Sequence, residues 1–354
     1  MKRNFDITRQ TIDKSRVDTL DETNIPFGQL YSDHMFIADY KNGEWQDLRI
    51  VPFGNISVSP ANTTLHYAIT VFEGLKAYRN QEGGVNIFRP DANAKRLNIS
   101  AERMCIPTVP EELFMQALTE LITLDQAWVP SLENTALYIR PFIFATDEFI
   151  GIRPSENFRF MIITSPVGAY YTRPVNVKIE THYARAVEGG TGFAKAGGNY
   201  GASLYPARQA KTKGFDQLIW TDAKTHQYIE ESGTMNVMFV IDGKIITAPT
   251  SGTILKGITR DSVLTLAKSW GLEVIEKPVA VKEIINTASE GRLEDAFGVG
   301  TAATIAPIAK IGFEEDIYEL PPVATRKLST QLLKALTDIR TGKAEDTNGW
   351  IHTI

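Results

Sequence analysis

Phe193-Ala194-Lys195-Ala196-Gly197-Gly198-Asn199-Tyr200-Gly201 is the most informative stretch of this sequence. A lysine placed for solubility normally lies on a polar face, whereas Lys195 has only apolar or small neighbours before a glycine-rich turn. This predicts a partly desolvated amine, and desolvation disfavours the ammonium form and leaves a better nucleophile, as imine chemistry requires. The alternative is a loop lysine whose aliphatic stem packs on Phe193.

The length and composition of the chain exclude several classes of protein. The chain has 354 residues, which is long for one hydrophobic core and comfortable for two domains. Its net charge is -5 and its pI is near 5.7, with no basic runs, which argues against general binding of nucleic acid or anionic membrane. The only cysteine, Cys105, cannot form an internal disulfide, and no apolar run approaches the ~20 residues that cross a bilayer. We expect a soluble, cytoplasmic protein without a metal site.

The periodicity divides the chain into four parts: an arm at residues 1–24, a small α+β domain at 25–168, a linker at 169–175 and a large domain at 176–354. Asn42-Gly43 and Asp242-Gly243 predict tight hairpin turns. Helices are expected at 63–72, from Asp91 as N-cap to about residue 104, at 202–213, from Thr259 as N-cap, and at 324–340.

Three further motifs follow Lys195 in order: Glu231-Ser232-Gly233-Thr234-Met235-Asn236, Gly257-Ile258-Thr259-Arg260-Asp261 and Phe297-Gly298-Val299-Gly300-Thr301-Ala302. Together they resemble the fold type IV pyridoxal-phosphate enzymes, and specifically the branched-chain amino acid aminotransferases. The resemblance runs from about residue 65 to 307 and resumes at 342–350. It implies an α/β fold with a small α+β sandwich domain and a larger α/β pseudo-barrel domain. It also implies pyridoxal 5′-phosphate as cofactor and a homodimer in which the partner subunit completes the pocket.

The resemblance assigns the catalytic groups. Lys195 matches the Schiff-base lysine, which also moves the proton at the substrate α-carbon. Glu231 matches the acidic partner of the pyridine nitrogen, and the neighbouring Glu230 is expected to be a solvated turn residue. Tyr200 matches the hydroxyl donor to the cofactor's phenolic oxygen; in isolation it would be read as core packing.

Other matching residues would hold the phosphate. Ile258 and Thr259 head a predicted helix, whose N-terminal amides and Thr259 hydroxyl form an anion cradle. The resemblance adds Thr234, Thr301 and Arg96. Residues 298–303 also fit the loose dinucleotide pattern G-x-G-x-x-A, but no long βαβ unit or ribose-binding acid accompanies it.

The substrate side is aromatic with a nearby cation, as a pocket must be to accept both an aliphatic side chain and the carboxylate of glutamate. The matching residues are Tyr67, Phe72, Tyr138, Arg140, Tyr170, Thr301 and Ala302, and Lys76 is a cation without an assigned role. The resemblance implies a ping-pong transfer of the amino group between leucine, isoleucine or valine and 2-oxoglutarate. Ala303 and Ala306 stand where the mammalian members have a C-x-x-C redox pair, so thiol regulation by that route is excluded.

Three alternatives remain at this point. A D-amino acid aminotransferase and an aminodeoxychorismate lyase share the fold, and a substrate panel separates them from the main interpretation. A non-catalytic anion-binding or dinucleotide-binding protein would rest on the glycine-rich turns alone, and it leaves the pairing of Lys195 with Glu231 unexplained.

Overall fold

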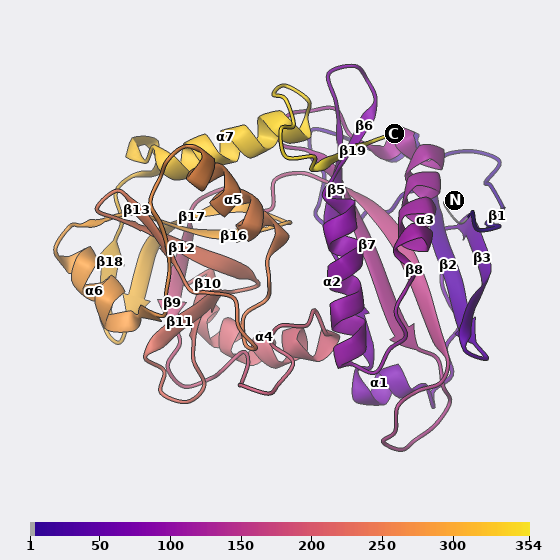
Figure 1. The fold of residues 1–354 in the computed structure, drawn as a ribbon, viewed down its shortest axis with the longest axis horizontal. Coiled ribbons are helices and arrows are strands. Elements are labelled where there is room, and N and C mark those ends of the chain that lie inside the picture. Colours follow the sequence, from indigo (N-terminus) through magenta and orange to yellow (C-terminus); the bar gives the residue numbers. More distant parts are fainter. Residues whose placement is uncertain (1–3) are drawn as a thin grey trace. The chain divides into compact units, whose positions relative to one another are not determined.

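The structure, a computed structural model, describes residues 4–354 and contains two compact units (Figure 1). The first unit comprises the chain up to Tyr170 together with Ala194–Gly197 and Asp338–Ile354, and the second comprises Tyr171–Phe193 and Gly198–Thr337. Both short segments fell in the large domain of the sequence analysis. They join the first unit through strand pairing between residues far apart in the chain, which periodicity does not reveal.

The first unit is built on one mixed sheet with strand order β1-β3-β2-β8-β7-β5-β6-β19, and β4 lies beside β7. Among the described residues of this sheet, only the β1–β3 pair is parallel. Asn42 and Gly43 have φ of 55° and 84° and close the β2–β3 hairpin, which confirms the predicted turn. The strands are β1 (Thr8–Arg9), β2 (His34–Lys41), β3 (Glu44–Pro52), β4 (Thr70–Phe72), β5 (Leu75–Arg79), β6 (Val85–Phe88), β7 (Ala136–Ala145), β8 (Phe158–Val167) and β19 (Ile351–Thr353).

Helices α2 (Pro90–Arg103) and α3 (Glu111–Leu124) cover this sheet. Their buried residues, among them Leu97 and Leu113, share one core with the sheet. Asp91 is not the N-cap of α2, because the helix already begins at Pro90, whose fixed φ suits a first helical position. The unit also contains α1 (Thr63–Tyr67), η1 (Val17–Thr19) and η2 (Gln126–Trp128).

The helix predicted over residues 63–72 is wrong in its second half. Asn62 caps α1 by accepting a hydrogen bond from the Thr64 amide, and the helix ends at Ala68, which has φ of 53°. Thr70, Val71 and Phe72 then pair with β7 as β4. Their β-branched and aromatic side chains suit a strand that gains ladder hydrogen bonds.

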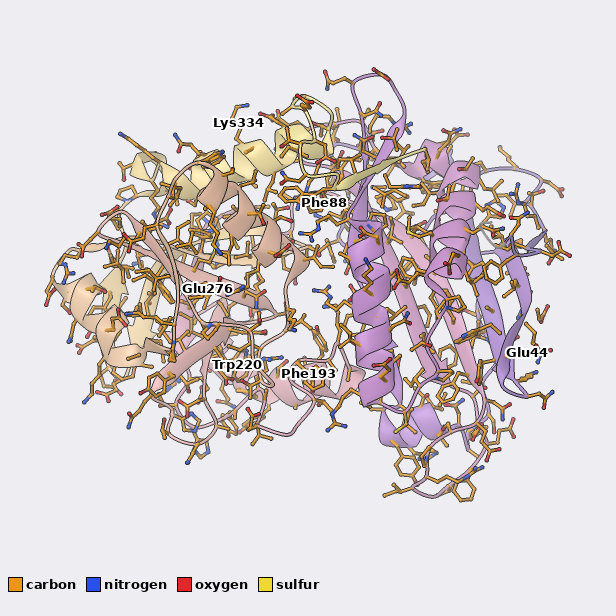
Figure 2. All side chains as sticks on the ribbon, in the orientation of Figure 1. Glu44, Phe88, Phe193, Trp220, Glu276 and Lys334 are labelled. Atoms are coloured by element: carbon orange, nitrogen blue, oxygen red, sulfur yellow. The ribbon has the colours of Figure 1, made fainter. Side chains whose placement is uncertain are left out.

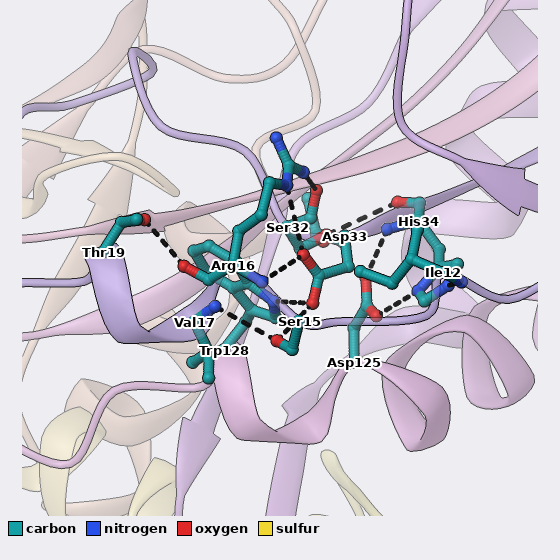
Figure 3. Close-up of polar contacts among 11 residues, drawn as sticks. Ile12, Ser15, Arg16, Val17, Thr19, Ser32, Asp33, His34, Asp125 and Trp128 are labelled. Carbon is teal, nitrogen blue, oxygen red and sulfur yellow. Dashed lines mark hydrogen bonds and ion pairs between the residues drawn. The ribbon is translucent and has the colours of Figure 1, made fainter.

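Residues 8–19 make specific contacts with the first unit, where polar composition had suggested a loosely held arm (Figure 3). The Asp33 carboxylate accepts hydrogen bonds from the Ser15 hydroxyl at 2.5 Å, the Arg16 amide at 3.1 Å and the Trp128 indole at 2.8 Å. Although burial opposes it, these donors hold the pKa of Asp33 below its usual value. Because these partners come from distant parts of the chain, the local sequence of the N-terminal segment does not predict the contacts.

A second contact of the N-terminal segment, beside Asp33, involves the buried His34. The Ile12 amide donates to Nε2 of His34 at 3.2 Å, and the other ring nitrogen lies 2.6 Å from Asp125. Since Nε2 accepts, Nδ1 is the nitrogen that donates to the carboxylate. His34 therefore connects the N-terminal segment to the residue that ends α3.

The second unit is built on strands that pair in a closed ring: β12-β16-β17-β9-β10-β11, with β11 pairing back to β12. This is the expected pseudo-barrel, and its core contains Val177, Phe239 and Ile308. Asp242 and Gly243, at φ of 49° and 72°, close the β12–β13 hairpin as predicted. The strands are β9 (Val175–Ile179), β10 (Gln217–Thr221), β11 (Tyr228–Ser232), β12 (Met235–Ile241), β13 (Lys244–Thr247), β14 (Val274–Glu276), β15 (Val279–Ala280), β16 (Leu293–Gly300), β17 (Thr304–Phe313) and β18 (Asp316–Glu319).

The remaining helices are α4 (Gly197–Thr212), α5 (Ile258–Ser269), α6 (Val281–Ser289), η3 (Val323–Thr325) and α7 (Leu328–Arg340). Helix α4 begins at Gly197, five residues before the predicted start, so the glycines after Lys195 belong to its first turn. Pro206 lies inside α4. Across residues 4–354 we find no helix with the length and apolar character needed to span a membrane.

Candidate active site

Lys195 lies in a segment that pairs with β4 in the first unit. The Phe72 amide donates to the Lys195 carbonyl at 3.1 Å, the Lys195 amide donates to the Ser100 hydroxyl at 2.9 Å, and Ala196 bridges to Val71. A Cβ on Gly197 would lie 2.7 Å from Cγ2 of Thr70, so a glycine is needed for this close approach. The backbone on both sides of Lys195 is therefore fixed.

The Lys195 amine faces an aromatic ring. Its Nζ lies 4.8 Å from the centroid of Phe72, and its side chain is half-buried. On the same ring, the Arg140 guanidinium carbon lies 4.6 Å from the centroid. Phe72 thus contacts two cations, which an aromatic face stabilises.

Arg140 also contacts Tyr138, its neighbour on the same face of β7. Its Nη2 donates to the Tyr138 hydroxyl at 3.0 Å, and within the described residues no carboxylate forms an ion pair with it. A Cβ on Gly74 would lie 2.1 Å from the Tyr138 hydroxyl, so only glycine leaves room for this ring. Arg140 is a partly buried cation without an acidic partner in the described part of the chain.

Two aromatic residues of the predicted pocket, Tyr138 and Tyr170, meet through Phe27, which the sequence analysis missed. The Phe27 ring centroid lies 5.4 Å from that of Tyr138 and 4.8 Å from that of Tyr170. Burial, and then the neighbouring Tyr138, raises the pKa of Tyr170. Tyr67 is half-buried at the end of α1, with its ring 6.1 Å from that of His66.

Arg96, a predicted phosphate contact, forms a buried ion pair with Glu73. Its Nε and Nη2 donate to the two Glu73 carboxylate oxygens at 2.6 and 2.7 Å. Asn93 and the Gly74 amide donate to the same carboxylate at 3.0 and 3.1 Å. Glu73 is fully buried. Its role in the structure is to fix the orientation of Arg96.

Lys76 is another buried cation of the first unit. Burial, and then the nearby Arg340, lowers the pKa of Lys76 to about 7. Arg340 itself lies over Phe88, labelled in Figure 2, at 4.3 Å from the ring centroid. An amine with this pKa changes charge within the physiological range.

Glu231 lies on β11 in the second unit and is buried. Its Oε1 accepts a hydrogen bond from the Leu255 amide at 2.8 Å, and its Oε2 lies 3.2 Å from Nε of Arg185. The Trp220 indole, labelled in Figure 2, donates to the Gly233 carbonyl at 2.9 Å and so supports the adjoining turn. Arg185 is a second residue that the sequence analysis missed, although it lies ten residues before Lys195.

Glu230 is not the solvated turn residue that was expected. It is 8% exposed, and it accepts a hydrogen bond from the Thr253 hydroxyl at 2.5 Å. Burial raises the pKa of Glu230, against the Thr253 hydrogen bond and the nearby Arg185. The neighbours Glu230 and Glu231 are both buried because strand β11 is covered on its two faces.

The N-terminus of α5 lies next to the Glu231 contacts. Asn236 donates to the Leu255 carbonyl at 3.0 Å, and a Cβ on Gly257 would lie 1.9 Å from its side-chain oxygen. Gly257, not Thr259, is the N-cap, and Gly257 itself makes no side-chain cap hydrogen bond. Thr259 is buried in the first turn, two residues after the cap, so the prediction that it is the N-cap is wrong. The N-terminus of α5 carries the partial positive charge that favours an anion.

Two turns lie at the same end of the ring of strands. Asn236 on β12 pairs with Val299 on β16, so the β11–β12 turn with Thr234 is adjacent to the β16–β17 turn with Thr301 and Ala302. Thr234 is exposed. Tyr200 lies in the first turn of α4, half-buried, with its carbonyl accepting from Ser203 at 2.7 Å. Within residues 4–354, no three metal-ligating side chains form a metal-binding cluster.

Comparisons with known proteins identify the family of this chain. The family model described as "Amino-transferase class IV" matches residues 70–311. The branched-chain-amino-acid aminotransferase 2 of Bacillus subtilis is 43% identical over 356 residues, covering 98% of each chain. That of Mycobacterium tuberculosis is 43% identical and covers 93% of this chain and 92% of the other.

Solved structures give the same result. The branched-chain amino acid aminotransferase of Escherichia coli superposes with a TM-score of 0.73 at 28% identity, covering 90% of this chain and 98% of the other. A T.th. branched-chain amino acid aminotransferase with pyridoxamine 5′-phosphate superposes with a TM-score of 0.71 at 27% identity, covering 89% and 97%. The chain therefore belongs to the class IV aminotransferase family, with the type IV fold, and within it to the branched-chain amino acid aminotransferases.

Proposed function

We propose that this chain transfers the amino group between leucine, isoleucine or valine and 2-oxoglutarate in a ping-pong cycle, with pyridoxal 5′-phosphate as cofactor. The observation that carries the proposal is the Lys195 amine on the ring of Phe72, with Arg140 on the same ring and without an acidic partner in the described residues. The curated relatives at 43% identity carry the matching activity in their names.

The residues fit the cofactor. Pyridoxal phosphate needs an amine to carry it, an acid for its ring nitrogen and hydrogen-bond donors for its phosphate. Lys195 is the amine, the buried Glu231 is the acid, and the N-terminus of α5 is the helix end that favours a phosphate. When bound, the cofactor accepts the amino group and withdraws electrons from the substrate α-carbon.

The remaining contacts follow from residue chemistry. Lys195 moves the proton at the α-carbon, and the Tyr200 hydroxyl donates to the phenolic oxygen. Arg96, oriented by Glu73, contacts the phosphate. The backbone and hydroxyl groups of Thr234, Ile258, Thr259 and Thr301 complete the phosphate contacts.

The substrate pocket combines aromatic walls with a cation. Tyr67, Phe72, Tyr138 and Tyr170 surround the aliphatic side chain, and Arg140 binds the second carboxylate of the acidic substrate. The Thr301-Ala302 turn binds the α-carboxylate. In support, structures of the T.th. enzyme are described as complexes with 4-methylvaleric acid and with N-(5′-phosphopyridoxyl)-L-glutamate.

The assembly in this proposal is a homodimer in the cytoplasm. The first unit exposes four large apolar side chains on α1 and the β7–β8 loop, Leu65, Phe149, Ile150 and Ile152, with exposed fractions of 40–92%. Exposed apolar groups of this size are typical of subunit interfaces. Light scattering behind a sizing column measures the assembly, and a monomer at micromolar concentration contradicts the dimer.

The first test of the activity is the visible absorption of the purified protein with cofactor, before and after adding leucine. We expect a band that leucine bleaches and 2-oxoglutarate restores, and no such cycle in Lys195→Ala. Lys224→Ala, an exposed turn lysine, is the matched control. A protein that cannot be loaded with the cofactor contradicts the role of Lys195.

The same assay separates the alternatives. Bleaching by D-alanine instead of L-leucine indicates a D-amino acid aminotransferase, and release of pyruvate from aminodeoxychorismate indicates the lyase. The relatives reported above carry neither activity in their names. A colourless protein whose anion binding survives Lys195→Ala is non-catalytic.

A further inference from the structure

Arg185 lies where three segments of the second unit meet. Its Nε lies 3.2 Å from Oε2 of Glu231 on β11. Its Nη2 donates to the Gly192 carbonyl at 3.2 Å and to the Thr253 carbonyl. The Arg185 side chain is 9% exposed, so these contacts are made away from bulk water.

The backbone around this guanidinium is closely packed. A Cβ on Gly192 would lie 2.7 Å from the Thr253 carbonyl oxygen and 2.5 Å from Cβ of Ala186. The Phe193 amide donates to the Gly252 carbonyl at 3.2 Å, so two chain segments run against each other here. One segment leads into Lys195 three residues after Gly192, and the other leads through Leu255 into α5.

From this geometry we infer that Arg185 is a positioning residue for the reaction: it holds Glu231 ionised and oriented, and it fixes the segment at residues 251–255, whose Leu255 amide donates to Glu231. The inference rests on the proposed function, because it concerns the acid assigned to the cofactor's ring nitrogen. In this proposal Arg185 acts through Glu231 and not on the Lys195 amine or the substrate α-carbon.

The charges around the guanidinium support this role. A buried carboxylate is costly unless a cation or several donors compensate it, and Arg185 is a cation 3.2 Å from the Glu231 carboxylate. Glu230, the next residue on β11, is also close enough for Arg185 to act on it. Other charged groups that act on Glu230 are Asp222 and Glu188.

A planar guanidinium can contact three acceptors in different directions from one fixed orientation. An ammonium is a point charge on a flexible stem and does not hold such an orientation. We therefore expect a graded series. Arg185→Lys retains the charge and loses part of the orientation, and Arg185→Met loses both.

The first experiment uses the apoprotein, so that it does not depend on the cofactor. Unfolding midpoints in urea are measured from pH 5.5 to 9 for wild type, Arg185→Met, Glu231→Gln and the double variant. We expect Arg185→Met to acquire a pH dependence near neutrality as Glu231 takes up a proton, and Glu231→Gln to remove that dependence. Equal pH profiles in wild type and Arg185→Met overturn the inference.

The second experiment uses the holoenzyme. We expect Arg185→Met to raise the dissociation constant of pyridoxal phosphate by about 10-fold or more and to shift the pH profile of the cofactor's absorption band, with Arg185→Lys intermediate. Arg326→Met is the matched control, because Arg326 pairs with Asp295 in the same unit, at 3.1 Å, and is buried even more deeply than Arg185. It loses stability but keeps the wild-type profile. If Arg326→Met changes the dissociation constant and the pH profile as much as Arg185→Met does, the effect of Arg185 is only structural and the inference is overturned.

The two failures are distinguishable. If wild type does not bind the cofactor, the proposed function fails, while the apoprotein experiment still reports on the pairing of Arg185 with Glu231. If wild type cycles with leucine and 2-oxoglutarate but the Arg185 variants keep its cofactor affinity and both pH profiles, only the inference about Arg185 fails.

Discussion

The two compact units each bury one arginine–glutamate pair, and the pairs differ in geometry. In the first unit, Arg96 donates two nearly parallel hydrogen bonds to Glu73, and two more donors complete that carboxylate. In the second unit, Nε of Arg185 forms an ion pair with Glu231 without a hydrogen bond, and Nη2 of Arg185 donates to two carbonyl groups. The first pair is a bidentate one, whereas the second links an acid to the backbone segments around it.

This difference shows that burial alone does not identify an acid as catalytic. Glu73 is the more deeply buried of the two, at 0% exposure against 3% for Glu231. A bidentate pair with additional donors is the arrangement that stabilises an orientation. We therefore expect a change at Glu73 to act on stability first and a change at Glu231 to act on the reaction first.

The largest effect is expected from Glu73→Ala. It leaves the Arg96 guanidinium buried without its carboxylate, which costs about 3–5 kcal/mol in the free energy of unfolding. Urea denaturation measures the loss, and Glu156→Ala, at an exposed glutamate, is the control. A loss no larger than that of the control shows that Arg96 finds another arrangement, and the contrast between the pairs is then lost.

Glu231→Gln tests the other side of the comparison. The amide is neutral and cannot favour a protonated ring nitrogen, so kcat is expected to fall about 10²-fold or more while the fold is retained. Steady-state kinetics with leucine and 2-oxoglutarate give kcat, and circular dichroism checks the fold. A variant with wild-type kcat would make Glu231 a structural residue like Glu73.

Arg140 extends the comparison to an arginine without a carboxylate partner in the described residues. If the acidic substrate is its counter-ion, Arg140→Met raises the KM for 2-oxoglutarate about 10- to 100-fold, as expected when a charge-assisted pair is lost. The KM for leucine changes much less. Equal changes for both substrates indicate that Arg140 supports the pocket only through its contacts with Phe72 and Tyr138.

Lys76 is a buried cation with another cation as its neighbour, and it should give the smallest effect. Its pKa is lowered to about 7 in the folded protein from an ordinary value of 10.5, so the folded state binds fewer protons than the unfolded state between these pH values. Stability contributed by this group therefore rises as pH rises from about 7 to about 10. Lys76→Met should be more stable than wild type at pH 6 and should lose this advantage by pH 10. Thermal unfolding at both pH values measures this, and a gain independent of pH contradicts the charge explanation.

Much of the fold follows from local pattern. The Asn42-Gly43 and Asp242-Gly243 turns and the helix after Pro90 were predicted because turn residues and helical periodicity act over a few positions. The second half of the helix at 63–72 was mispredicted because β4 gains its stability from β7, about seventy residues away. Local propensity carries no information about such a partner.

The candidate site likewise has residues that the sequence predicts and contacts that only the structure reveals. Lys195 between small residues, Glu231 beside a glycine turn and the glycine before α5 are marks that the sequence alone determined, because desolvation, positive φ and helix starts each restrict the residue types allowed. Only the tertiary structure decided which groups are partners: Phe72 for Lys195, Glu73 for Arg96 and Arg185 for Glu231. The physical reason is that the free energy of a buried charge depends on which atoms surround it in space, and folding brings those atoms from segments that share no local pattern.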